Sequence, residues 1–432
     1  RGFLMDYHQA VAYLDRHIGL GGKPGLDRIN DLLDHMGRPD DGYPIIHVAG
    51  TNGKTSTSRF ATLILVAHGL TTGTHTSPHL QKVEERLAIN GRFATADEFA
   101  LAMSDVAAFA DLREERGAEP NTYFELATAS AFAFFADQAV NAAVLEVGLG
   151  GRLDATNVVD AEVCVVTSIG VDHTEYLGED IASIAAEKVA IVGPKSILVT
   201  GPLPDQALDE TNRKSRELGI QHRRFGVDYS LGDSERGVGG WLATIHGAEE
   251  DYEDIFLPLH GKYQLFNLSV AVAAAEAMLG GMLDVEALRD AIAAARMPGR
   301  MEPLSSSPLV LVDGAHNADG ISALVESLRE EFTTIRWQLL LGVMGDKNVE
   351  LMVDRLEPVL DGVITTAVDD KRAVDPLKLA DRVAKVVDIP VLAGETVEDA
   401  LDMARAEAGG DGAVLVTGSL YLVGAVRDLL KG

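Results

Sequence analysis

Residues 45–58 read Ile-Ile-His-Val-Ala-Gly-Thr-Asn-Gly-Lys-Thr-Ser-Thr-Ser, an apolar run that passes through a Gly-rich turn into a helical segment. Such a turn directs consecutive backbone N–H groups at one point, and the helix that begins there adds the positive end of its dipole. Lys54 can reach phosphate oxygens, and the hydroxyl of Thr55 can ligate Mg²⁺. We therefore predict a nucleoside triphosphate site here; the alternative is an ordinary Gly/Asn connection between a strand and a helix.

The general phosphate-loop pattern, G-x-x-x-x-G-K-[ST], is incomplete in this chain. Val48 stands where that pattern has its first glycine. What remains is the shorter turn Gly-Thr-Asn-Gly-Lys-Thr, which keeps the lysine and the hydroxyl that contact phosphate and metal. The chemistry of a triphosphate site is therefore retained.

Composition limits the classes of partner. A length of 432 residues favours two domains. The 37 Lys+Arg against 66 Asp+Glu give a net charge of −29, which argues against nucleic-acid and anionic-membrane partners. A single cysteine, Cys164, excludes an internal disulfide and fits a reducing compartment. With no signal peptide or long apolar run, we expect a cytoplasmic protein.

Apolar strand-like runs alternate with helical stretches, which predicts an α/β fold of parallel sheets covered by helices. The Gly-rich, acidic tract 228–258 interrupts this alternation and predicts a small antiparallel excursion, with short pieces near 241–245 and 254–257. In this first part the pattern predicts helices at 6–16, 26–36, 125–137 and 264–279, and strands at 142–147, 162–168 and 196–200.

A break at Arg296-Met297-Pro298-Gly299-Arg300 separates a second region, and Ser305-Ser306-Ser307-Pro308 lies just beyond it. After the break the alternation restarts, which predicts a second, smaller doubly wound unit. Its strands are expected near 309–313, 337–342, 362–366, 390–392 and 413–417.

Polar groups follow neighbouring strands of the first sheet. Glu146 ends an apolar strand, where a buried acid is costly unless it is paired or binds metal. Asp172 and His173 follow the next strand, and ligands gather at the carboxyl ends of parallel strands. Taken alone, His173 is more often a loop histidine. Together with Thr55 and Glu146 it predicts an oxygen-rich site with one imidazole, suited to Mg²⁺ or Mn²⁺.

Lys188 lies in Ile-Ala-Ala-Glu-Lys-Val-Ala-Ile-Val, a helix with few polar residues. One interpretation is a snorkelling or paired surface lysine. The other starts from apolar surroundings, which lower the pKa of an amine and leave it free to react. Reaction with CO₂ would make it a carbamate, which is a carboxylate-like metal ligand.

The motifs in series resemble the folylpolyglutamate synthase/dihydrofolate synthase family of the Mur ligase superfamily, nearly end to end and in order. The tracts 145–157, Leu-Glu-Val-Gly-Leu-Gly-Gly-Arg-Leu-Asp-Ala-Thr-Asn, and 416–424, Val-Thr-Gly-Ser-Leu-Tyr-Leu-Val-Gly, are the most specific. The others are Gly-Thr-Asn-Gly-Lys-Thr at 50–55, Thr-Ser-Pro-His-Leu at 76–80, Glu-Arg-Leu-Ala-Ile-Asn-Gly at 85–91, Tyr-Phe-Glu at 123–125, Asp-His-Thr-Glu-Tyr-Leu-Gly at 172–178, Gly-Lys-Tyr-Gln-Leu-Phe-Asn at 261–267, Pro-Gly-Arg at 298–300 and Asp-Gly-Ala-His-Asn at 313–317.

This resemblance implies a Mur-ligase-type ATPase domain at 1–296, with a mostly parallel sheet, helices on both faces and a small antiparallel sheet. It also implies a hinge at 297–303 and a Rossmann-like glutamate ligase domain at 304–432. We expect the protein to be a monomer. The expected activity is ATP-dependent addition of L-glutamate to a folate or dihydropteroate carboxylate through an acyl phosphate.

The resemblance also assigns roles, in four groups. Nucleotide binding falls to Gly50, Thr51, Asn52, Gly53, Lys54, Thr55, Ser56, Asn267, Arg300 and Asp313. The expected ligands of one Mg²⁺ are Thr55, Ser77 and Glu146. The expected ligands of a second are Glu146, His173 and a carbamylated Lys188. Substrate contacts fall to Phe124 (stacking on a pterin), Asp154, His316 and Ser419. Lys54, Lys188, His173, Arg300 and His316 are the expected catalytic residues.

The sequence departs from the family pattern in three places. Val189-Ala190 follows Lys188 where the family has Ala-Gly, Tyr263 stands where His is common, and Gln81-Lys82-Val83-Glu84 is less typical of the pterin-side loop. The pterin substrate therefore stays open, and two rivals remain. One is another Mur-type ligase with a different carboxylate acceptor, against which Phe124 and the tract 145–157 argue. The other is a nucleotide-gated switch without ligase chemistry.

Overall fold

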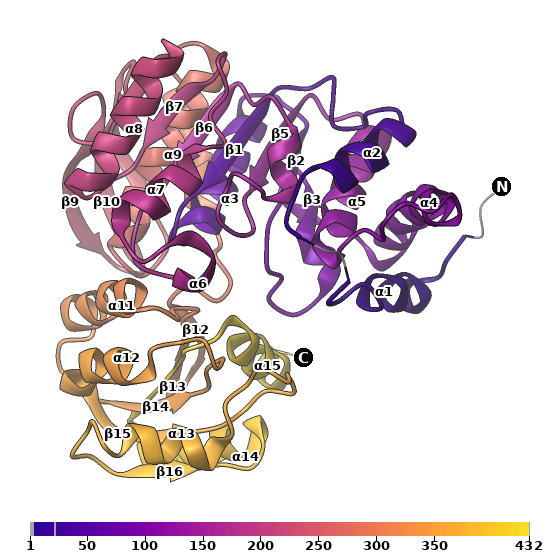
Figure 1. Cartoon of the computed structure of the whole chain (residues 1–432). Coiled ribbons are helices and arrows are strands. Elements are labelled where there is room, and N and C mark those ends of the chain that lie inside the picture. Colours follow the sequence, from indigo (N-terminus) through magenta and orange to yellow (C-terminus); the bar gives the residue numbers. More distant parts are fainter. Residues whose placement is uncertain (1–3, 21–22, 432) are drawn as a thin grey trace. The chain divides into compact units, whose positions relative to one another are not determined.

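The computed structural model describes residues 4–20 and 23–431, which form two compact units. The first unit holds the chain up to Arg236, Leu242–Leu257 and Leu265–Ala295. The second holds Gly237–Trp241, Pro258–Gln264 and the chain from Arg296 onward. Each unit is described by itself below (Figure 1).

The first unit is built on an eight-stranded sheet with the order β4-β3-β2-β5-β1-β6-β7-β8. Six neighbouring strands pair in parallel, in the order β2-β5-β1-β6-β7-β8. Strands β3 and β4 form an antiparallel edge beside β2. Because β5, β1 and β6 are adjacent and parallel, the loops after them meet at one edge of the sheet. The strands are β1 (Ile45–Ala49), β2 (Thr72–His75), β3 (Leu87–Ile89), β4 (Arg92–Phe93), β5 (Ala142–Glu146), β6 (Val163–Val166), β7 (Ile197–Thr200) and β8 (His222–Arg224).

Helices cover both faces of this sheet. One face packs against α3, and the other packs against α5, on which α4 and α2 lie. The helices are α1 (Tyr7–Asp15), α2 (Asp27–His35), α3 (Lys54–Ala67), α4 (Ala96–Glu115), α5 (Tyr123–Asp137), α6 (Thr174–Leu177), α7 (Ile181–Val189), α8 (Asp205–Leu218), α9 (Tyr263–Leu279) and α10 (Val285–Ala293), with short 3₁₀ turns η1 (Val83–Arg86) and η2 (Ala155–Val158).

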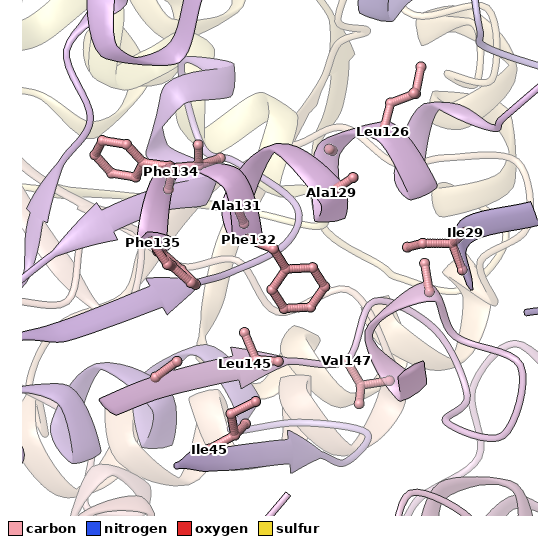
Figure 2. Close-up of a cluster of buried hydrophobic side chains, with 14 of the residues drawn as sticks. Ile29, Ile45, Leu126, Ala129, Ala131, Phe132, Phe134, Phe135, Leu145 and Val147 are labelled. Carbon is pink, nitrogen blue, oxygen red and sulfur yellow. The ribbon is translucent and has the colours of Figure 1, made fainter. Parts of the chain in front are cut away.

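The core between α5 and the sheet follows from the pattern of α5, which is apolar on nearly every side. The rings of Phe132 and Phe135 lie on the side of α5 that faces the strands carrying Ile45 and Leu145 (Figure 2). Successive strand residues point to opposite faces, so the odd-numbered residues of β5 enter this core and the even-numbered ones face α3.

Helix α5 begins two residues earlier than the predicted 125. The side chain of Thr122 accepts a hydrogen bond from the Glu125 backbone, and that of Glu125 accepts one from the Thr122 backbone. This capping box satisfies two backbone donors that would otherwise lack partners. As a result Phe124 lies in the first turn of the helix instead of in the loop before it.

The tract 228–258 forms the predicted small antiparallel sheet, with the order β11-β10-β9. The two expected pieces correspond to β10 and β11, while the first strand of the sheet was not predicted individually. Its residues alternate poorly because glycine and acidic residues dominate the strand. The strands are β9 (Ser230–Gly237), β10 (Gly240–His246) and β11 (Asp251–Leu257).

The second unit is a doubly wound domain on a six-stranded sheet with the order β12-β13-β17-β14-β15-β16. All five predicted strands are present, and an antiparallel edge strand, β12, was missed because its sequence reads as a break. The elements are β12 (Glu302–Ser306), β13 (Leu309–Val312), α11 (Ala318–Glu331), β14 (Trp337–Leu341), α12 (Val349–Leu356), η3 (Glu357–Val359), β15 (Leu360–Thr365), α13 (Pro376–Val383), β16 (Val391–Ala393), α14 (Val397–Ala408), β17 (Ala413–Thr417) and α15 (Leu420–Lys431).

The predicted α/β class is thus confirmed: a mostly parallel sheet with helices on both faces, a small antiparallel sheet, and a second doubly wound unit. Within the described residues, no helix is long and apolar enough to cross a membrane.

The core of the first unit should respond strongly to loss of a phenylalanine ring. We expect Phe132→Ala to lower the free energy of unfolding by about 3–5 kcal/mol, because the ring is fully buried and its removal leaves a cavity. Phe93→Ala, at an exposed position, is the matched control and should cost far less. Urea unfolding followed by circular dichroism measures both; equal losses would contradict this account of the core.

Candidate active site

The turn between β1 and α3 is held by the loop that follows β6. The Thr51 N–H donates to Ser168 O (2.8 Å), and the Asn52 N–H donates to Ser168 Oγ (2.9 Å). In return, the hydroxyls of Thr167 and Ser168 donate to Asn52 O. Gly53 has φ +84°, and a Cβ at that position would lie 2.4 Å from Asn267 Oδ1, so only glycine fits. The predicted turn is therefore a rigid one that opens helix α3 at Lys54.

Two lysine ammonium groups converge on one carbonyl oxygen of this turn. Lys54 Nζ donates to Gly50 O (2.9 Å) and to Thr51 O (3.1 Å). Lys188 Nζ, from α7, donates to the same Gly50 O at 3.0 Å. Burial, followed by the nearby charge of Lys54, lowers the pKa of Lys188 to about 7. A substantial fraction of this amine is therefore neutral near pH 7, unlike that of an exposed lysine.

Glu146 gathers two of the predicted metal ligands at the end of β5. Its Oε1 accepts from the Thr55 hydroxyl (2.8 Å), and its Oε2 accepts from the Ser77 backbone N–H (3.2 Å). The Ser77 hydroxyl is buried and has no hydrogen-bond partner in the part of the chain described here. A carboxylate, a hydroxyl and an unsatisfied buried hydroxyl form an oxygen donor set, which fits a hard cation such as Mg²⁺.

His173 lies at the N-terminus of α6 with left-handed backbone (φ 51°), next to Asp172. Its Nε2 lies 4.0 Å from Asp172 Oδ1. The residues described contain no cluster of three or more His, Cys, Asp and Glu side chains able to hold a metal. The predicted ligands include only two residues of those types, Glu146 and His173, because the others are hydroxyls and a lysine.

Phe124 lies over the loop that follows Glu146. A Cβ on Gly148 would be 2.6 Å from Phe124 Cζ, so the ring rests directly on the glycine backbone. The His75 ring lies 6.0 Å away, centre to centre, at 37°. Phe124 is only partly buried, with one side packed on the core. The ring is thus fixed in place while part of it stays accessible to solvent.

Asp154 is the acid that shapes the same loop. Its Oδ2 accepts from the Leu149 N–H (2.9 Å), and its Oδ1 accepts from the hydroxyl (2.6 Å) and the N–H (3.0 Å) of Thr156. Burial raises the pKa of Asp154, against the effect of these donors. The carboxyl group therefore braces the loop that carries Gly148.

In the second unit, the loop after β13 collects the predicted polar residues. Asp313 Oδ2 accepts from the Met301 N–H (2.9 Å) and the Tyr263 hydroxyl (3.1 Å). Burial raises the pKa of Asp313, and the charge of Arg300 opposes this shift. The Arg300 guanidinium donates to Gly299 O at 3.1 Å. Arg300 and Asp313 are thus neighbours within the second unit.

His316 and Ser419 lie on adjacent loops of that unit. His316 Nδ1 is 2.8 Å from Gly314 O. Ser419 is buried just before α15, and its hydroxyl accepts from the Tyr421 N–H (3.2 Å). The two loops are joined because the Gly418 N–H donates to Ala315 O (3.0 Å). Both predicted residues therefore stand at the carboxyl ends of neighbouring parallel strands, β13 and β17.

Comparison with known proteins agrees with this geometry. Residues 48–275 match the Mur ligase middle domain, and residues 299–420 match the Mur ligase glutamate ligase domain. The dihydrofolate synthase/folylpolyglutamate synthase of Mycobacterium tuberculosis is 36% identical over 94% of this chain and 90% of its own length. The corresponding Bacillus subtilis protein is 32% identical over 98% and 99%. The chain belongs to the dihydrofolate synthase/folylpolyglutamate synthase family.

Solved structures agree with that assignment. The Mycobacterium tuberculosis folylpolyglutamate synthase complexed with ADP superposes with a TM-score of 0.94 at 36% identity, covering 99% of this chain and 98% of that one. Escherichia coli FolC in complex with DHPP and ADP superposes with a TM-score of 0.88 at 30% identity, covering 99% and 98%. As a member of this family, the chain is an ATP-dependent ligase.

Several residues that contact the predicted site residues within each unit were not predicted individually. Thr167 and Ser168 hold the turn, Gly148 carries the Phe124 ring, and Tyr263 binds Asp313. Thr167 and Ser168 end the predicted strand 162–168, so their position at the ligand edge of the sheet was available from sequence. The contact between Gly148 and Phe124 was not, because it depends on tertiary packing.

Proposed function

We propose that this ligase adds L-glutamate to the carboxylate of a pterin acceptor, dihydropteroate or a folate, with ATP as the second substrate. The observation that carries the proposal is the shared sheet edge: the Lys54 turn, the Glu146 cluster and the loop under Phe124 follow adjacent parallel strands. The proposed phosphate turn and the aromatic platform are on loops that are distant in sequence but follow neighbouring strands, β1 and β5. Relatives solved with ADP, and with DHPP and ADP, support both parts.

The nucleotide is proposed to bind at the 50–53 turn. Its backbone N–H groups and Lys54 neutralise phosphate oxygens, and helix α3 presents its positive end there. Thr51, Asn52, Ser56 and Asn267 would complete the first-unit contacts. Transfer of the γ-phosphoryl group to the acceptor carboxylate needs positive charge on the equatorial oxygens, which Lys54 supplies. The glutamate amine then displaces phosphate from the acyl phosphate, forming the amide bond.

We propose two Mg²⁺ sites. The first would be held by Thr55, Ser77 and Glu146, whose oxygens include the unsatisfied Ser77 hydroxyl. The second would be held by Glu146, His173 and a carbamylated Lys188. When bound, such ions neutralise phosphate charge and orient the transferring group; Mn²⁺ has the same ligand preferences.

Carbamylation of Lys188 is supported by its surroundings. The neutral amine attacks CO₂, a C–N bond forms, and one proton leaves to solvent. The product is an anion next to the Lys54 ammonium, so it exchanges a like-charge pair for an attractive one. With Val189 and Ala190 following it, Lys188 is still buried beside Gly50 O.

The acceptor is proposed to stack on Phe124, with Asp154 nearby in the same loop. His316 and Ser419, with Arg300 and Asp313, are proposed to serve the nucleotide and the incoming glutamate from the second unit. We also propose residues 297–303 as a hinge between an ATPase domain at 1–296 and a glutamate ligase domain at 304–432. Movement there would close the site and protect the acyl phosphate from water. We propose that the protein acts as a monomer.

A substrate panel tests the function. With ATP and L-glutamate, dihydropteroate or a folate should gain one glutamyl unit, detected by mass spectrometry. Lys54→Ala is the control and should lose this activity while remaining folded. Glutamate-dependent phosphate release with a peptidoglycan precursor, and none with any pterin, would instead assign a different Mur-type acceptor.

The modification of Lys188 has a direct readout. Protein equilibrated with ¹³C-bicarbonate should show a carbamate carbon by NMR. Its intensity should rise with pH through about 7, because only the neutral amine reacts and burial lowers the pKa of Lys188 to that value. Lys188→Ala should lose the signal and nearly all turnover, whereas Lys195→Ala, at a highly exposed lysine, should keep both. Near-normal turnover of Lys188→Ala would refute the proposed role.

The role of Phe124 is tested by comparing how a substitution changes KM for the pterin acceptor and KM for ATP. Phe124→Ala should raise KM for the pterin acceptor by a factor that corresponds to about 1–3 kcal/mol of lost binding free energy, as for base–aromatic stacking. KM for ATP should barely change, because the nucleotide site is the Lys54 turn. Gly148→Ala should act in the same direction, since its Cβ would displace the ring. Equal effects on both substrates would make Phe124 a core residue only.

A further inference from the structure

A fully buried histidine, His47, stands in the middle of β1 and has no part in the site described so far. It points to the same face of the sheet as Ile45 and Ala49, toward α5. Its Nε2 lies 2.8 Å from Thr156 Oγ1. Its Nδ1 is buried and has no hydrogen-bond partner among residues 4–20 and 23–431. An aliphatic residue would fill a central strand position at lower cost, so the imidazole invites a functional explanation.

The hydrogen bonds around Thr156 fix the direction of a buried chain. The Thr156 hydroxyl lies 2.6 Å from Asp154 Oδ1, and backbone N–H groups of Leu149 and Thr156 donate to the two carboxylate oxygens. The Thr156 hydroxyl donates its single proton to Asp154 Oδ1, so it can only accept from His47. The His47 proton must then be on Nε2, and burial keeps the ring neutral by lowering its pKa to about 3.

This chain ends on the loop that carries the acceptor platform. Asp154 holds the Leu149 N–H, next to Gly148 under Phe124. Further along the loop, a Cβ on Gly151 would lie 2.6 Å from Glu187 O in α7, the helix of Lys188. The loop is therefore packed between the Phe124 ring and α7 with little room to move. A small shift of the loop would therefore disturb its contacts with both the Phe124 ring and α7.

We propose that His47 and Thr156 are positioning residues, which fix the 148–154 loop so that Phe124 is held for the pterin acceptor. Strand β1 also leads into the 50–53 turn, so the same strand would set the nucleotide turn at its end and the acceptor loop through His47. The identity of the acceptor rests on the proposed function. The placement of the loop by the His47–Thr156–Asp154 chain does not.

Thr156 offers a matched pair of substitutions. Thr156→Val keeps the shape and removes the hydroxyl, while Thr156→Ser keeps the hydroxyl. We expect Thr156→Val to raise KM for the pterin acceptor about tenfold, the size of one lost buried hydrogen bond, with KM for ATP within about twofold. Thr156→Ser should stay near the wild type. Thr211→Val, which removes a buried hydroxyl bonded to Leu208 O in α8, is the control for general destabilisation.

Two readouts do not depend on activity. The ¹⁵N spectrum of histidine-labelled protein should show His47 as the Nε2–H tautomer, and Thr156→Val should speed amide exchange at Leu149 where Thr211→Val does not. An Nδ1–H tautomer, unchanged exchange, or equal effects of Thr156→Ser and Thr156→Val would overturn the proposal. If the wild type adds no glutamate to any pterin, the proposed function fails, and the tautomer and exchange data still decide the placement of the loop.

Discussion

The ligase site depends on one set of hydrogen bonds, those between the 50–53 turn and residues 167–170. A Gly-rich turn on its own has many conformations, and ordering it costs entropy. Here the N–H groups of Thr51 and Asn52 donate to Ser168. The hydroxyls of Thr167 and Ser168 donate to Asn52 O. Because these partners follow β6, the turn is fixed only when β1 and β6 are paired. The conformation of the turn, where we propose that phosphate binds, therefore depends on the sheet and not on the turn alone.

The distribution of charge is the second constraint. The chain carries a net charge of −29, yet it needs to bind a polyanionic nucleotide. Positive charge is concentrated locally at the 50–53 turn, where the amino groups of Lys54 and Lys188 share a single carbonyl oxygen. Burial, and after it the nearby charge of Lys54, lowers the pKa of Lys188 to about 7.

Sequence was sufficient wherever periodicity and strand-end placement decide the structure. The strands that carry Glu146 and Thr417, the antiparallel tract and the Lys54 turn all follow from local pattern. It was insufficient where packing decides. The contact of Lys188 with Gly50 O joins residues 138 positions apart, and Phe124 meets Gly148 only through the start of α5 at Tyr123. Edge strand β12 was missed because its Pro and Ser residues read as a break.

The second unit does not consist of one continuous segment, since it takes in Pro258–Gln264. Glu331, at the end of α11, binds His260 Nδ1 (2.7 Å) and the Gly261 N–H (2.6 Å), and Asp313 binds the Tyr263 hydroxyl. A gene fragment that begins near residue 304 would leave both of these buried acids without those partners. Recombination or insertion that treats the second unit as a portable module would therefore have to carry this distant heptapeptide with it.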